Sequence, residues 1–90
     1  MKPQIKKNSL IRLNRIAGQV RGLARMVEKE TYCIDIITQS SAIKEALSGV
    51  EHLILENHLA THVIEQMKGG QEKKATQEVL KVYKLAQRKK

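Results

Sequence analysis

The sequence predicts an all-α protein with three helices, of which the middle one is long. Its only proline is Pro3, and few glycines interrupt the chain between Ser9 and Lys68. The 90 residues include two Tyr but no Phe or Trp, so one copy has few large side chains with which to fill a core. We therefore expect a single domain, residues 1–90, that completes its core by associating with further copies.

The first predicted helix begins near Leu10 and ends near Val27. Its apolar residues recur at the three- and four-residue spacing of an amphipathic helix. They are Leu10, Leu13, Ile16, Ala17, Val20, Leu23, Ala24 and Val27. Asn8 or Ser9 is expected to cap this helix, and Thr31 to cap the next one after a break at 29–31.

The second predicted helix extends from Tyr32 to Met67 and ends at Gly69–Gly70. If it is continuous, about 36 residues at a rise of ~1.5 Å form a rod of roughly 54 Å. A chain of this size cannot cover such a rod alone, which again favours association. The third predicted helix extends from Lys73 to about Arg88, with a frayed basic tail.

The charge of the chain, +8 in total, is unevenly distributed. Residues 1–29 contain eight Lys or Arg and one acid, residues 30–67 one Lys and six acids, and residues 68–90 eight Lys or Arg and two acids. Basic ends favour a surface that binds a polyanion, although a basic surface that only maintains solubility fits the charge equally well. Because aromatic residues are scarce, duplex DNA or structured RNA is expected rather than stacked single strands.

The single cysteine, Cys33, excludes an intramolecular disulfide and indicates a reducing compartment. The chain has neither a signal-peptide pattern nor an apolar run of membrane-spanning length, so we expect a soluble, cytoplasmic protein. No Ser/His/Asp or paired-carboxylate arrangement indicates an enzyme, and no small-molecule substrate is expected.

His58 and His62 are four residues apart, which places two imidazoles on one face of a helix. This spacing alone is weak evidence for a metal, since it also fits a hydrated polar surface. Cys33 precedes the two histidines by 25 and 29 residues, and at ~100° per residue it shares their face. Along a straight helix it lies about 37–43 Å away, so one chain cannot assemble the three side chains.

Two antiparallel copies can assemble them. A two-fold axis near residues 46–47 sets Cys33 of one chain opposite His58 and His62 of the other, and Lys44 opposite Glu51 of the partner. A thiolate and two imidazoles suit Cu(I), Zn(II), Co(II) or Ni(II). A buried structural cysteine with two surface histidines is the alternative.

Three segments of the chain resemble the copper-sensitive operon repressor family, whose relatives include nickel/cobalt, formaldehyde and sulfide sensors. They are Arg12–Leu23, Tyr32–Gln39 and His58–His62. The resemblance implies three-helix protomers, an antiparallel dimer with a four-helix-bundle core, and a homotetramer formed from two dimers. It also implies binding to double-stranded operator DNA without ligand and release when the inducer binds.

The resemblance also assigns roles to individual residues. It implies metal ligation by Cys33, His58 and His62, and a link from the ligand to DNA release through Tyr32 and Glu78. Helix 1 is expected to bind DNA together with Lys44 and the basic third helix. Within this surface, Arg12 and Arg15 stand in the family's R-x-x-R motif, and Arg21 is a further predicted contact.

The choice of inducer follows from differences between the branches. The copper sensors carry a second Cys where this chain has His62, a departure also found within the family. The nickel/cobalt branch adds an N-terminal His, which residues 1–7 lack; the sulfide branch adds a second Cys; and the formaldehyde branch uses an N-terminal Pro, whereas Lys2 precedes Pro3 here. Cu(I) is therefore the expected inducer.

Several alternatives remain open at this point. The chain could sense nickel/cobalt, zinc or formaldehyde on the same scaffold. It could store metal without binding DNA, or bind nucleic acid generally without responding to metal.

Overall fold

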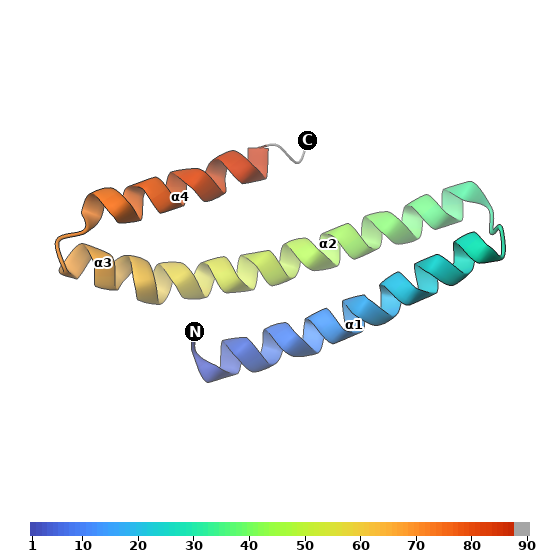
Figure 1. Cartoon of the computed structure of the whole chain (residues 1–90), viewed down its shortest axis with the longest axis horizontal. Helices are drawn as coiled ribbons and strands as arrows, with labels where there is room; N and C mark the ends of the chain where they lie inside the picture. The colour runs from blue at the N-terminus through green and yellow to red at the C-terminus, as the bar shows by residue number, and fades with distance from the viewer. Residues whose placement is uncertain (88–90) are drawn as a thin grey trace. The chain divides into compact units, whose positions relative to one another are not determined.

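The computed structural model describes residues 1–87, which form helices and turns without a strand. The elements are α1 (Pro3–Glu28), α2 (Cys33–His58), the π-helical turn η1 (Leu59–Val63), α3 (Ile64–Lys68) and α4 (Glu72–Gln87) (Figure 1). Because α2, η1 and α3 follow one another without a loop, the predicted all-α fold with a long middle helix is confirmed. The π-helical turn within that helix was not predicted. The chain divides into two units, residues 1–57 and the part from His58 onward.

Helix α1 begins well before the predicted start near Leu10. Lys2 is its N-cap residue in an extended conformation (φ −62°, ψ 141°), and Pro3 occupies the first helical position. A proline is favourable there, because its fixed φ suits the helix and the N–H that it lacks has no acceptor in the first turn. Ser9 lies inside the helix and is buried. The prediction that Asn8 or Ser9 caps the helix is therefore wrong.

The turn between α1 and α2 closes with the hydrogen bonds of a Schellman motif. The N–H of Thr31 donates to the carbonyl of Met26, and that of Glu30 to the carbonyl of Val27, both at 3.0 Å. Glu30 adopts the left-handed conformation (φ 54°) that this motif requires and that favours glycine. Helix α2 begins at Cys33, so Thr31 belongs to the preceding turn and is not the cap that the sequence predicted.

The turn between α3 and α4 has the same form. The N–H of Gln71 donates to the carbonyl of Gln66 at 2.6 Å, and that of Gly70 to the carbonyl of Met67 at 3.2 Å. Here a glycine, Gly70, supplies the positive φ of 79°. The predicted stop of the long helix at Gly69–Gly70 is confirmed.

In the first unit, α1 and α2 lie side by side and antiparallel (Figure 1). Their contact is apolar: Ile16 of α1 packs with Ile43 and Val50 of α2, and partly buried neighbours surround these three residues. The neighbours are Leu23, Ala46 and Ile54. Other residues of the predicted apolar stripe of α1 remain exposed, among them Leu10 (51%) and Val27 (57%), because α2 covers only part of it.

The second unit contains η1, α3 and α4, with α4 packed against α3. Among its described residues, Ala75 is the buried apolar one, whereas Leu80, Tyr83 and Leu85 of α4 are largely exposed. Within residues 1–87, no helix is both long and apolar enough to cross a membrane.

Candidate functional site

The two histidines of the predicted site face each other in the second unit. His58 ends α2 and is the N-cap of the π-helical turn, and His62 lies within that turn. Their ring centroids are 5.4 Å apart with an interplanar angle of 30°. π-Helical turns inside α-helices occur frequently at functional sites. The irregular turn thus falls on the segment that carries the imidazoles.

Helix α4 contributes a carboxylate to this pair. The Nε2 of His58 lies 3.1 Å from Oε2 of Glu78, and the two side chains are 33% and 36% exposed. A carboxylate accepts hydrogen bonds, so the imidazole donates its Nε2–H. This tautomer has its lone pair on Nδ1, which makes Nδ1 the nitrogen of His58 that can bind a further ligand.

A residue that the sequence did not single out also belongs to this cluster. The amide nitrogen of Gln66, on α3, lies 3.5 Å from both Oε1 and Oε2 of Glu78. Its position four residues after His62 placed it on the same helical side. Glutamine is common on exposed helical surfaces, however, and nothing in the sequence distinguished this one.

The other predicted ligand lies in the first unit. Cys33 is a free, exposed thiol at the first position of α2, and Tyr32 before it is 70% exposed. Among the side chains that the structure describes, no group of three or more His, Cys, Asp or Glu could hold a metal ion within one chain. Of the three predicted ligands, Cys33 thus belongs to the first unit, and His58 and His62 belong to the second.

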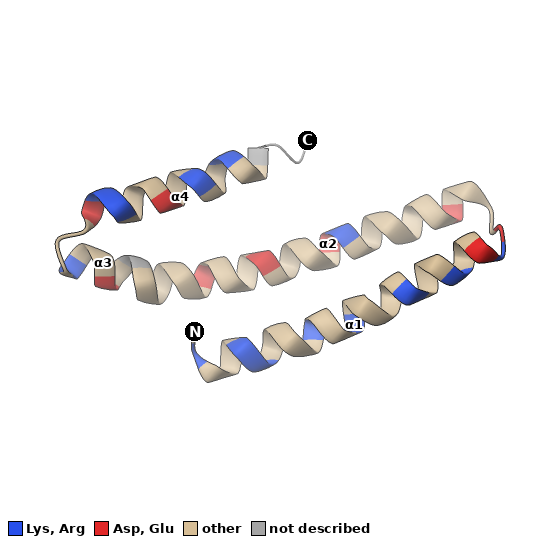
Figure 2. Ribbon diagram, viewed as in Figure 1, with Lys and Arg blue, Asp and Glu red and all other residues tan. Residues whose placement is uncertain are grey.

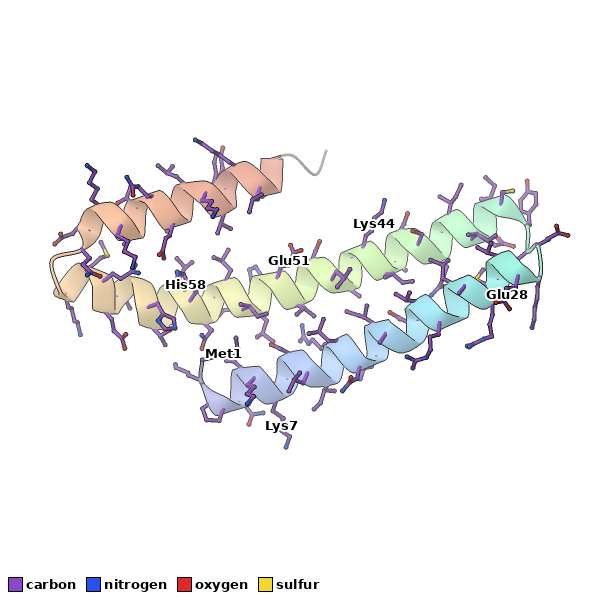
Figure 3. All side chains as sticks on the ribbon, viewed as in Figure 1. Met1, Lys7, Glu28, Lys44, Glu51 and His58 are labelled. Carbon is purple, nitrogen blue, oxygen red and sulfur yellow. The ribbon has the colours of Figure 1, made fainter. Side chains whose placement is uncertain are left out.

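The predicted DNA contacts are exposed but do not share one face. Arg12, Arg15 and Arg21 lie on α1, where basic residues outnumber acidic ones (Figure 2). Arg12 and Arg21 are nine residues apart, or about 180° around the helix at ~100° per residue. The guanidinium of Arg12 lies beside α2, 3.8 Å from where a Cβ of Gly49 would stand. Lys44 points away from α1 (Figure 3).

Comparison with known proteins places this chain among repressors. Residues 5–85 match the model of the family described as metal-sensitive transcriptional repressor. The copper-sensing transcriptional repressor CsoR of Bacillus subtilis is 44% identical over 73 residues, 81% of this chain and 72% of the relative. The copper-sensing transcriptional repressor RicR of Mycobacterium tuberculosis is 51% identical over 57 residues, 63% of this chain and 59% of the relative.

A solved structure agrees with these matches. The crystal structure of the copper-sensing repressor CsoR with Cu(I) from Geobacillus thermodenitrificans has a TM-score of 0.87 to this chain at 39% sequence identity. The superposition covers 94% of this chain and 88% of that one. Together with the family match over residues 5–85, these similarities show that the chain belongs to the metal-sensitive transcriptional repressor family.

Proposed function

We propose that this protein represses transcription by binding double-stranded operator DNA, and that it releases the DNA when Cu(I) binds at Cys33, His58 and His62. The contact of His58 with both His62 and Glu78 carries the proposal, since it connects two metal-binding side chains to a second helix. Two similar proteins are named copper-sensing repressors, and the similar crystal structure contains Cu(I). Copper is therefore favoured over zinc, nickel, cobalt and formaldehyde.

The donor atoms of this chain fit a copper site. Cys33 is a free and exposed thiol, and the rings of His58 and His62 face each other. Soft thiolate and imidazole donors of this kind suit Cu(I), which accepts a three-coordinate environment. His58 would bind through Nδ1, because its Nε2 is already directed at Glu78.

The three ligands would come from two chains. In the antiparallel arrangement, Cys33 of one copy lies opposite His58 and His62 of the other, so each dimer holds two sites. Exposed apolar residues on α2 support association: Ile34 is 56% exposed, Ile37 58% and Leu47 39%. Two such dimers would form the homotetramer, in which residues 1–90 of each copy act as one repressor domain.

The link from metal to DNA would run through Glu78. A hydrogen bond from the distal nitrogen of a ligating histidine to a carboxylate orients the ring and strengthens when the ring binds a metal. A stronger bond from His58 would fix Glu78, and with it α4, in one position. The basic residues of α4 would then move relative to those of α1, and Tyr32, adjacent to Cys33, would complete the contact from the partner chain.

The DNA surface would combine several copies. Since Arg12, Arg15, Arg21 and Lys44 do not share one face of a single chain, one copy presents only part of the set to a duplex. A change in how the copies are arranged would therefore separate the phosphate contacts. Each contact contributes to affinity mainly through counterion release.

The test is DNA binding as a function of metal. Duplexes selected from a random pool by the metal-free protein would be titrated by fluorescence anisotropy, alone and with Cu(I), Zn(II), Ni(II) or Co(II). We expect Cu(I) to weaken binding by about 5- to 150-fold, the usual range of such coupling. Metal binding with unchanged DNA affinity would indicate a storage protein instead. DNA binding indifferent to every metal and to formaldehyde would indicate a general nucleic-acid-binding protein.

A further inference from the structure

Gln66 contacts the carboxylate of Glu78 from the side of α3. Its amide nitrogen is equidistant, at 3.5 Å, from the two carboxylate oxygens. The oxygen of the same side-chain amide, Oε1, is buried and has no hydrogen-bond partner among the residues that the structure describes. The amide is thus bound at one end only, the end that faces Glu78.

The backbone on both sides of this contact is held by one turn. The backbone carbonyl of Gln66 accepts the N–H of Gln71 in the turn that ends α3, and Glu78 lies on α4, seven residues after Gln71. Gln66 and Glu78 are therefore attached to the two ends of a short, hydrogen-bonded connection.

The carboxylate needs a second donor to keep its orientation. His58 lies close to one oxygen, Oε2, and a single hydrogen bond leaves a glutamate side chain free to rotate about its last torsion angle. The amide of Gln66, 3.5 Å from each oxygen, is a second donor group beside this carboxylate and adds a contact from α3 to the one from His58.

We infer that Gln66 is a positioning residue that holds Glu78 so that Oε2 accepts the Nε2–H of His58. It thereby determines which nitrogen of His58 is left to bind a metal. The effect of Gln66 on the tautomer of His58 is a property of the metal-free protein and does not depend on the proposed function. The effect on DNA release rests on the proposed function.

A space-filling role does not account for Gln66. A buried carbonyl oxygen without a partner is unfavourable, and an apolar side chain of the same shape would remove that cost. Gln66→Met should therefore leave the stability of the protein unchanged or raise it. Any change at His58 in this variant can then be attributed to the lost donor and not to unfolding.

The first test is the tautomer of His58 in the metal-free protein, read from its two ¹⁵N chemical shifts. In the parent we expect separate shifts typical of a protonated Nε2 and an unprotonated Nδ1. In Gln66→Met the two shifts should move toward each other as the second tautomer becomes populated. Gln77→Met, an exposed substitution next to Glu78 on α4, should leave both shifts as in the parent. Unchanged shifts in a folded Gln66→Met protein would overturn the inference.

The second test separates metal binding from signalling. We expect Gln66→Met to retain Cu(I) affinity within about tenfold, the lower end of what outer hydrogen-bond partners contribute. The factor by which Cu(I) weakens DNA binding should fall about fivefold or more. A factor equal to that of the parent would contradict a role in signalling. If Cu(I) does not weaken DNA binding by the parent protein, the proposed function fails. The tautomer experiment then still tests the positioning role of Gln66.

Gln66→Glu has the same length and keeps the inference testable if the methionine variant does not fold. It replaces the amide donor with a second carboxylate beside Glu78, and like charges repel. We expect the same convergence of the His58 shifts as in Gln66→Met. Parent-like shifts in this variant would overturn the inference as well.

Discussion

Different kinds of interaction hold the helices together inside each of the two units. Between α1 and α2, apolar side chains pack around Ile16, Ile43 and Val50. Between η1, α3 and α4, Ala75 is the buried apolar residue that the structure describes, and His58, Gln66 and Glu78 form a polar cluster. The first unit has an ordinary apolar core, whereas the second contains polar side chains, including His58, that can bind a ligand.

This difference suggests that the stability of the fold and the response to a ligand depend on different residues. Burial of apolar side chains stabilises a fold whether or not a ligand is present. The contact of His58 with Glu78, whose side chains are 33% and 36% exposed, would contribute only about 0–1 kcal/mol to stability even if it were an ion pair. Its geometry can therefore respond to a ligand on His58 without endangering the fold.

The largest expected effect tests whether the site combines Cys33 of one copy with His58 and His62 of another. Cys33→Ala and His58→Ala/His62→Ala proteins should each lack the copper site. Co-refolded as a mixture, they should regain about one site per heterodimer, because each chain supplies what the other lacks. The measurement is the thiolate charge-transfer absorbance per dimer. A mixture that binds no Cu(I) while both parents are folded would exclude the antiparallel arrangement.

The next effect concerns the apolar unit. Ile43 is 6% exposed, and truncation of a buried isoleucine to alanine typically costs about 2–5 kcal/mol. We expect Ile43→Ala to lower the free energy of unfolding by this amount, measured by urea denaturation at fixed protein concentration. Glu45→Ala, an exposed change on the same helix, should alter it by less than about 0.5 kcal/mol. Equal stabilities would mean that the Ile16–Ile43–Val50 cluster does not hold α1 to α2.

A smaller effect is expected at the basic surface of the first unit. The double substitution of Arg12 and Arg15 by Ala should weaken DNA binding and lower its salt dependence by about one unit of slope per lost phosphate contact. Binding isotherms at several salt concentrations give the slope. Lys7→Ala, a change on the same helix, provides a control for lost charge outside the predicted set. An unchanged slope in the double variant would remove these arginines from the interface.

The smallest effect concerns the two turns. Glu30 adopts a positive φ of 54° where the other turn has Gly70, and this conformation costs a residue with a Cβ roughly 1 kcal/mol. Glu30→Gly should therefore stabilise the protein by about that much, and Gly70→Ala should destabilise it similarly. Thermal denaturation of the two variants beside the parent checks both signs. Destabilisation by Glu30→Gly would show that the glutamate side chain has a role of its own.

The sequence predicted the class of fold and the pairing of His58 with His62, because both depend on local periodicity. It did not predict the start of α1 at Pro3, because the predicted apolar stripe begins only at Leu10. A proline is compatible with the first turn of a helix, although not with a later one. The π-helical turn and the contact of Gln66 with Glu78 also escaped prediction. The contact depends on packing between α3 and α4, to which the spacing of residues along one helix is insensitive.

The proposal that His58 and Glu78 link metal binding to DNA release while contributing little to stability can be tested with one variant. DNA affinity of Glu78→Ala would be measured in the metal-free and Cu(I)-saturated forms, with Glu72→Ala on the same helix as the control. We predict nearly parental metal affinity, a change in stability within about 1 kcal/mol, and a ratio of the two DNA affinities close to one. A ratio as large as that of the parent, typically equivalent to about 1–3 kcal/mol, would contradict the account.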